Sequence, residues 1–327
     1  MITFTYTELS NQFFFISNLA EWHFSCKKHY NDIWLENNPL SKEEKEAIVK
    51  IKPILQKYGV HRKLKNKYVG VVFFLDDTQW EHLSEMVTEK DYKIFQDVFN
   101  IFQKRFDQIW KTEEKKIKKW KEILENSEAI KSKEIIKDIK SFLNSKADPD
   151  IETYLLITPC PDREIYGGAN EGENKISTQV SNKSEKYLSR ILAVLFHEVA
   201  HVYQRDYAND LTRKYIEKNN LIEKYKKIRP DLSKQGFGAR SLFSETIVGF
   251  LFNGYWEGTL TTKHLQHSKN NKFEKNRSTA KPQTINNILS LSMEMAGPKI
   301  KEYLENNKKI DEELLEFIWK NFEEMNS

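Results

Sequence analysis

The chain has 327 residues, of which 31% are charged and 13% are aromatic. This length and composition allow a sizeable core and are not typical of a disordered protein. Basic residues exceed acidic ones by only 52 − 48 = 4 and are spread along the sequence, so we expect no nucleic-acid partner.

Neither a secretory signal nor a transmembrane segment is expected from the sequence. Residues 1–8 contain neither the basic nor the apolar stretch of a secretory signal, and no segment approaches the roughly 20 apolar residues that span a bilayer. Cys26 and Cys160 are far apart and neither belongs to a C-x-x-C pair, so we expect no disulfide framework and no cysteine zinc site. These observations favour a cytoplasmic protein without a membrane partner.

Residues 1–149 are expected to form a helical N-terminal region. An aromatic-rich helical stretch spans 13–22. Ser41 and Glu44 have the spacing of a capping box, which predicts the start of a second helix. Pro53 is expected to bend or divide that helix, because proline removes a backbone donor and clashes with the preceding turn.

The rest of this region is dominated by a long helical pattern. Apolar residues recur at spacings of three and four from 91 to 126, which predicts one amphipathic helix. Residues 128–144 are expected to form a further helix, and 147–150 a domain boundary. The apolar run 69–75 is too short for its spacing to decide between a strand and a buried helical segment.

The character of the sequence changes after this boundary. Residues 151–158 read as a strand, and a glycine-containing turn follows at 166–170. Residues 175–180 alternate apolar and polar side chains, as a half-exposed strand does. We therefore expect a mainly α-helical protein with a small mixed β-sheet, which is an α+β fold.

Helical patterns occupy most of the remaining sequence. Helices are expected at 185–205, 210–229, 241–256, 285–306 and 311–322. Residues 263–281 are polar and basic with almost no apolar side chains, which predicts a mobile loop.

The first of these helices contains the pentapeptide H-E-V-A-H, with His197 and His201 at its ends. Residues four apart lie on one face of a helix, so both imidazoles can reach one metal ion. Glu198 lies one residue round from His197 and can reach a water molecule on that metal. Two nitrogen ligands, a carboxylate base and an open position are typical of a zinc hydrolase.

A catalytic zinc usually has three protein ligands. Glu245 is a lone carboxylate in an apolar helical segment, where a cation or a strong donor must compensate its charge. We therefore expect it to be the third ligand. The alternatives are Asp206, which is expected on the opposite helix face from His201, and a Glu245 that is solvated or paired with Arg240.

On these residues the chain resembles the gluzincins, metallopeptidases with H-E-x-x-H on one helix and a glutamate ligand on a second. Minigluzincins and related predicted bacterial zinc proteases have a comparably compact core. The order of elements matches from 151 to 256, roughly a third of the chain. The resemblance implies that His197, His201 and Glu245 bind Zn²⁺ and that Glu198 is the general base.

The resemblance implies further roles. Residues 175–180 would be the edge strand that pairs with an extended peptide substrate. A tyrosine or histidine would stabilise the oxyanion; Tyr255 is the expected residue, with His264 and Tyr207 as alternatives. Thermolysin-like members carry an aspartate four residues after the glutamate ligand to orient a zinc-bound histidine. Gly249 stands there in this sequence, so the orienting partner must come from elsewhere.

Together these features predict a zinc metallopeptidase domain at 150–327 that hydrolyses a peptide or protein substrate. The alternative is a regulatory or partner-binding protein that uses a latent or inactive zinc-bound scaffold of the same kind. Hydrolysis of a non-peptide amide would use the same chemistry with a different pocket. The sequence does not indicate which oligomeric state the protein has.

Overall fold

The computed structural model describes residues 1–22, 26, 31–58, 63–64, 67–68, 73, 79–159, 167–172, 174–180, 187–252 and 284–327. The chain packs as two compact units, Met1–Ile130 with Pro149–Leu195 and Lys131–Asp148 with Phe196–Ser327. This division differs from the expected boundary at 149/150, because each unit takes chain from both sides of it.

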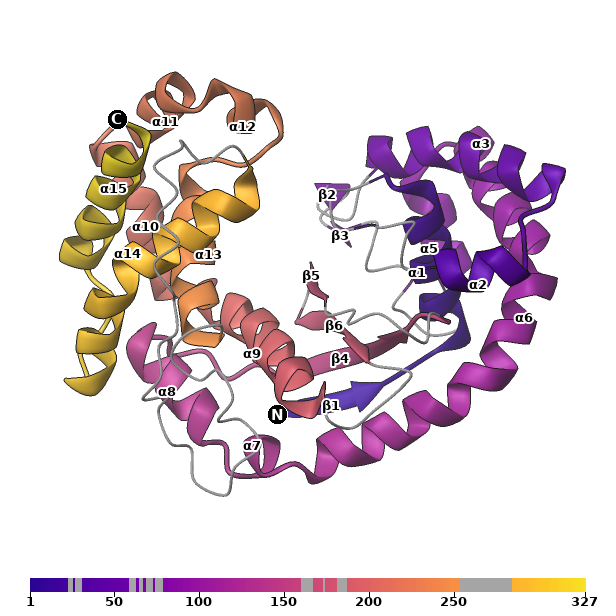
Figure 1. Ribbon diagram of the computed structural model, residues 1–327, viewed down its shortest axis with the longest axis horizontal. Helices are drawn as coiled ribbons and strands as arrows, with labels where there is room; N and C mark the ends of the chain where they lie inside the picture. The colour runs from indigo at the N-terminus through magenta and orange to yellow at the C-terminus, as the bar shows by residue number, and fades with distance from the viewer. Residues whose placement is uncertain are drawn as a thin grey trace. The chain divides into compact units, whose positions relative to one another are not determined.

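The first unit contains a mixed β-sheet (Figure 1). Its strands, in spatial order, are β1 (Ile2–Thr5), β4 (Ile151–Ile157), β6 (Lys175–Val180) and β5 (Gly168–Gly172). β4 runs parallel to both β1 and β6, and β5 is antiparallel to β6. The expected mainly α-helical fold with a small mixed sheet is thus confirmed, although sequence reasoning missed β1 and interpreted β5 as part of a turn.

The position of β6 corrects two expectations. It is hydrogen-bonded to β4 on one side and β5 on the other, so β6 is not an edge strand. It is also not half-exposed, since every residue after Lys175 is buried. A polar side chain is accommodated there because Ser177 Oγ donates to Glu171 Oε1 of β5 at 2.7 Å. Among the described strands, β5 forms the edge on this side of the sheet.

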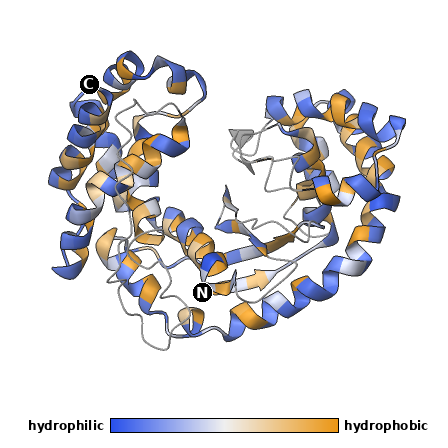
Figure 2. Cartoon of the chain, viewed as in Figure 1, coloured by the Kyte–Doolittle hydropathy of each residue, from blue (hydrophilic) through white to orange (hydrophobic). Residues whose placement is uncertain are grey.

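Helices cover much of the first unit. They are α1 (Glu8–Ala20), α2 (Asp32–Asn37), α3 (Lys42–Tyr58), α5 (Gln79–Met86) and α6 (Glu89–Asn126). Two short strands of the same unit, β2 (Lys63–Leu64) and β3 (Lys67–Tyr68), pair with each other. α6 is one unbroken helix, as its apolar spacing predicts. Figure 2 shows its hydrophobic and hydrophilic residues alternating along its length. Pro53 lies inside α3 without dividing it.

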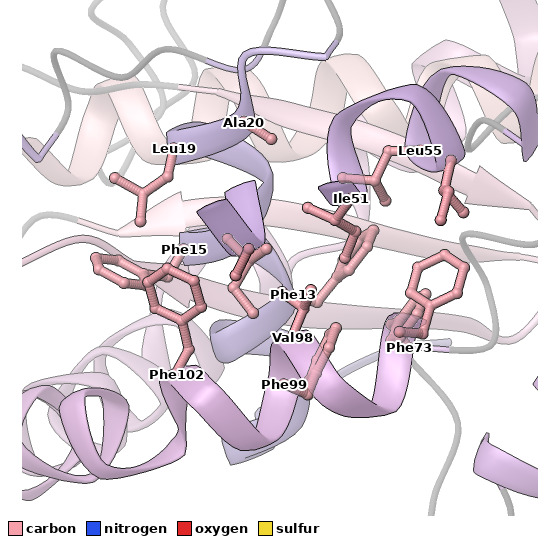
Figure 3. Close-up of a cluster of buried hydrophobic side chains, with 14 of the residues drawn as sticks. Phe13, Phe15, Leu19, Ala20, Ile51, Leu55, Phe73, Val98, Phe99 and Phe102 are labelled. Carbon is pink, nitrogen blue, oxygen red and sulfur yellow. The ribbon is translucent and has the colours of Figure 1, made fainter. Parts of the chain in front are cut away.

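Aromatic side chains form much of this unit's core. Phe13 and Phe15 of α1 pack with Phe99 and Phe102 of α6, and Ile51 of α3 belongs to the same buried cluster (Figure 3). The expected helical stretch 13–22 thus contributes buried aromatic side chains to this core.

The capping box at the start of α3 is confirmed. Ser41 N donates to Glu44 Oε2 at 2.7 Å, and Glu44 N donates to Ser41 Oγ at 3.2 Å. Glu44 also pairs with Arg105 of α6, whose Nη2 lies 2.7 Å from Oε2. One carboxylate therefore caps α3 and joins it to α6.

The remaining helices lie in the second unit, except for most of α7 (Glu128–Lys131) and the first half of α9 (Leu188–Gln204). Those two parts belong to the first unit. The other helices are α8 (Glu134–Phe142), α10 (Tyr207–Lys218), α11 (Leu221–Ile228), α12 (Pro230–Lys234), α13 (Ala239–Phe250), α14 (Ile285–Glu305) and α15 (Glu312–Asn326).

Two of the expected helices are interrupted. The segment 128–144 divides into α7 and α8, with Lys133 at φ 59° between them. The segment 210–229 divides into α10 and α11 at Asn220, where φ is 50°. A positive φ ends α-helical hydrogen bonding, and asparagine tolerates it better than most residues. Pro230 follows the end of α11 and is the first residue of α12.

Some expectations fall outside the described residues, namely those for 69–75 apart from Phe73, for Cys160 and for the loop at 263–281. Cys26 is half-buried. Of the helices in the described part of the chain, none combines the length and apolar character needed to cross a bilayer.

Candidate metal centre

Helix α9 is buried along most of its surface but has one open stripe. Between Arg190 and Gln204, the residues that are not buried are Arg190, Val194, His197 and His201. Their spacing of three and four residues places them on a single helix face. The apolar residues between them, such as Phe196 and Val199, fix the helix against the core and leave both imidazoles on its accessible side.

Helix α13 supplies the third side chain. Leu242, Phe243 and Thr246 are buried, whereas Ser244 and Glu245 are partly accessible. The Glu245 carboxylate meets the two histidines, with Oε2 3.3 Å from His197 Nε2 and Oε1 3.4 Å from His201 Nε2. The structure therefore brings together the three expected ligands. All three belong to the second unit.

The separations in this cluster match those of a metal's ligand shell. The Nε2 atoms of His197 and His201 are 3.1 Å apart, and each of them lies 3.3 or 3.4 Å from a different oxygen of the Glu245 carboxylate. Zinc bonds of about 2.0–2.1 Å to nitrogen and oxygen place tetrahedral ligands about 3.3–3.4 Å apart. Among the described residues, this is the one group of three or more His, Cys, Asp and Glu side chains that could hold a metal ion.

The electrostatics of the cluster favour a bound cation. Burial raises the pKa of Glu245, but hydrogen bonds and charge from the two histidines outweigh it and hold that pKa well below its usual range. Burial lowers the pKa of His201, yet the hydrogen bond and negative charge of Glu245 bring it to about 9. The ionised carboxylate thus attracts positive charge to the point where the Nε2 atoms converge.

Glu198 lies beside this cluster without belonging to it. Its side chain is buried with the residue 8% exposed, and burial raises its pKa while the charges of His197 and His201 lower it. The same carboxyl is repelled by Glu245. The Glu198 carboxyl group thus interacts electrostatically with all three candidate ligands.

The alternative third ligand is directed elsewhere. Asp206 Oδ2 accepts a hydrogen bond from Lys146 N at 2.8 Å and another from Ser145 Oγ at 3.4 Å. Asp206 therefore joins the end of α9 to the segment after α8, and it is not part of the histidine cluster. Tyr207 is exposed at the start of α10, whereas Tyr255 and His264 lie outside the described residues, so the oxyanion role stays a prediction.

Two further residues at this site were not identified from the sequence. Gln204 Oε1 lies 2.9 Å from His201 Nδ1 and accepts a hydrogen bond from Ser244 Oγ at 2.7 Å. Gln204 follows His201 by three residues and Ser244 directly precedes Glu245. The i, i+3 spacing within α9 was an available signal, because residues three apart on a helix are neighbours.

The position of the thermolysin-type aspartate has another role here. A Cβ atom on Gly249 would lie 2.5 Å from Met293 Sδ of α14. Gly249 therefore lets α14 pack closely against α13, and no side chain at this position orients a histidine. The His201 ring instead contacts a side chain of its own helix, because Gln204 Oε1 lies 2.9 Å from Nδ1.

Comparisons of the chain with protein-family models, curated proteins and solved structures found no match. The class of site is therefore defined by its own geometry, which is that of two histidines on one helix and a glutamate on a second around a shared point.

Proposed function

We propose that this protein is a zinc metallopeptidase that hydrolyses peptide bonds at the cluster of His197, His201 and Glu245. The observation that supports the proposal is the convergence of two Nε2 atoms, 3.1 Å apart, with the two oxygens of one carboxylate at 3.3 and 3.4 Å. This donor set fits zinc, because a catalytic zinc takes three nitrogen or oxygen ligands and keeps one open position. The arrangement on two helices also agrees with the proposed resemblance to gluzincins.

The residues divide the chemistry between them. When bound, zinc supplies Lewis-acid polarisation of the scissile carbonyl and makes a water molecule more acidic. Glu198 takes a proton from the attacking water and delivers it to the nitrogen of the leaving amine. Tyr255 is proposed to donate to the oxyanion. A cytoplasmic location and a peptide or protein substrate remain part of the proposal.

Substitution of Glu198 tests the catalytic role separately from the metal site. Glu198→Gln keeps the side chain's size but removes its ability to take a proton. We expect the variant to bind about one zinc per chain, as three-ligand sites do, and to lose hydrolysis of a mixed peptide library by at least about 100-fold. Metal content is measured by mass spectrometry and cleavage by product analysis.

Glu217→Gln is the matched control, since Glu217 is exposed on α10 in the same unit. It is expected to keep both zinc and activity. A folded, zinc-loaded Glu198→Gln protein that cleaves as fast as the wild type would contradict the assignment of the general base. A zinc-loaded wild type that cleaves no peptide would contradict the peptidase proposal.

A further inference from the structure

We propose that Gln204 and Ser244 form a positioning pair that orients His201 for metal binding and holds the two ligand helices in register. The inference deepens the proposed function and rests on it. Gln204 is the last residue of α9, and Ser244 lies on α13 directly before Glu245. The pair therefore connects the helix that carries both histidines with the helix that carries the glutamate.

The Gln204 amide determines which nitrogen of the His201 ring carries a hydrogen. A carboxamide oxygen can only accept hydrogen bonds. Because Gln204 Oε1 lies 2.9 Å from His201 Nδ1, that nitrogen must carry a hydrogen and donate it. The lone pair of the neutral ring is then on Nε2, the atom that faces Glu245 and His197. Such an outer contact fixes the tautomer and the orientation of a metal-binding histidine.

Gln204 and Ser244 also form a contact between the two helices. Ser244 Oγ donates to the same Gln204 oxygen at 2.7 Å and lies 3.2 Å from His201 Nδ1. Gln204 Nε2 also points toward the backbone carbonyl of Ser244, at 3.5 Å. A rotation or shift of α13 that moved Glu245 away from the histidines would break these contacts. The amide thus links the position of the third ligand to the orientation of the second.

Burial of the Gln204 amide has a free-energy cost that its hydrogen bonds must offset. Gln204 is 3% exposed, and a buried amide destabilises the fold unless its polar atoms are hydrogen-bonded. Its partners are His201 and Ser244, so the amide is satisfied only while the ring and the two helices keep this arrangement. A leucine or methionine of similar size would fill the same space without that requirement.

Gln204→Met, Gln204→Glu and Ser244→Ala test the pair in the full-length protein. The measurement is the zinc dissociation constant, obtained by competition with a chelating dye. Outer contacts to metal-binding histidines contribute about 10- to 100-fold in metal affinity, so we expect a loss of that size in Gln204→Met. Gln204→Glu restores an acceptor for Nδ1–H and is expected to restore most of the affinity. Ser244→Ala is expected to cause a smaller loss.

A general loss of stability is distinguished by a matched control. Gln12 of α1 is 2% exposed and its Nε2 donates to Phe99 O at 3.0 Å in the first unit. Gln12→Met therefore removes a buried amide of the same kind away from the cluster, and we expect unchanged zinc affinity. In the zinc-loaded wild type, the Nδ1–H of His201 should give a slowly exchanging resonance in histidine-labelled NMR spectra that Gln204→Met lacks.

The double variant Gln204→Met, Ser244→Ala tests the coupling. If the two residues act as one network, it should bind zinc no more weakly than Gln204→Met alone. Additive losses would overturn the coupling between the helices. Wild-type affinity in Gln204→Met, or an equal loss in Gln12→Met, would overturn the positioning role alone. A wild type that binds no zinc would overturn both this inference and the proposed function.

Discussion

At the scale of single residues, the site depends on which side chains the two helices leave accessible. Burial of the residues around them holds His197 and His201 on the open stripe of α9, and Glu245 is held at contact distance from α13. The exposed fractions of these side chains are 21% for His197, 15% for His201 and 34% for Glu245. They are accessible enough to exchange a ligand and enclosed enough to strengthen its electrostatic binding.

Removal of the glutamate tests its role as third ligand. We expect Glu245→Ala to lose the zinc that copurifies with the wild type, because two imidazoles without the carboxylate bind the ion more weakly. Asp206→Ala is the matched control, since Asp206 is the nearest downstream carboxylate to His201 and accepts hydrogen bonds from Lys146 and Ser145 instead. Its zinc content should equal that of the wild type, as measured by mass spectrometry. Retention of zinc by Glu245→Ala would show that the third ligand is a different residue.

At the scale of elements, Glu44 shows how one side chain fixes the position of a helix. Burial raises its pKa, but hydrogen bonds from Arg105 and Ser41 outweigh that effect and lower the pKa below its ordinary value of 4.5. The folded state therefore binds a proton at Glu44 less readily than the unfolded state does. Its contribution to stability is present above about pH 4.5 and is lost as the pH falls through the lower, folded-state pKa.

Glu44→Gln keeps the shape of the capping box but removes the charge that Arg105 contacts. We expect it to reduce the free energy of unfolding by about 2 kcal/mol at pH 7, the usual size for a hydrogen bond to a charged group. The deficit should shrink as the pH falls below about 4.5, because the wild type then loses the same charge. Urea unfolding across this pH range measures it.

The neighbouring exposed residue provides the comparison. Glu43→Gln changes an exposed carboxylate in the same turn of α3, and surface substitutions of this kind usually change stability by less than about 0.5 kcal/mol. A deficit in Glu44→Gln that is independent of pH, or one matched by Glu43→Gln, would show that the ion pair with Arg105 does not stabilise the fold.

The elements that sequence reasoning identified are those with strong local signals. The apolar spacing of α6, the capping box of α3 and the H-E-V-A-H segment of α9 are each contained within one stretch of chain. The errors arose where the deciding partner is distant in sequence. β1 is a strand because it pairs with β4, and β6 is an internal strand because β5 pairs with its other side. Neither the pairing of β1 with β4 nor that of β5 with β6 produces a recognisable pattern within one stretch of sequence.

The candidate site follows the same rule. His197, His201 and Glu198 have fixed spacing within one helix, and Glu245 was identified because an isolated carboxylate in an apolar helix needs compensation. Gln204 and Ser244 were missed because glutamine and serine are common polar residues. Their meaning appears only when α13 lies against α9 and their oxygens are 2.7 Å apart.

At the scale of the whole molecule, the metal cluster lies in one unit. His197, His201 and Glu245 all belong to the part formed by Lys131–Asp148 and Phe196–Ser327. A ligand that binds only the folded state stabilises by RT ln(1 + [L]/Kd), about 2.7 kcal/mol at 100 times the dissociation constant. We therefore expect zinc to protect the segments that carry its ligands more than the other unit.

Hydrogen exchange measured by mass spectrometry, with zinc and with chelator, tests this expectation. Zinc should slow exchange in peptides from α13 and the second half of α9 by up to about 100-fold. Peptides from α3 and α6 should be unchanged. His201→Ala should show no zinc-dependent protection in either set. Protection of α3 and α6 equal to that of α13 would contradict a site confined to the second unit.

The pairing of β1 with β4 also determines when the first unit can form during synthesis. Ile2 aligns with Ile151, and β6 joins β4 only after a further stretch of chain. At about 5–20 residues per second, a ribosome needs about 7–30 s to make the intervening residues. During that interval β1 cannot yet pair with β4. The apolar faces of α1 and α3 are made within the same interval. The sheet therefore cannot assemble until after α6 has been synthesised. Chaperones that shield apolar segments can bind the nascent chain during that interval.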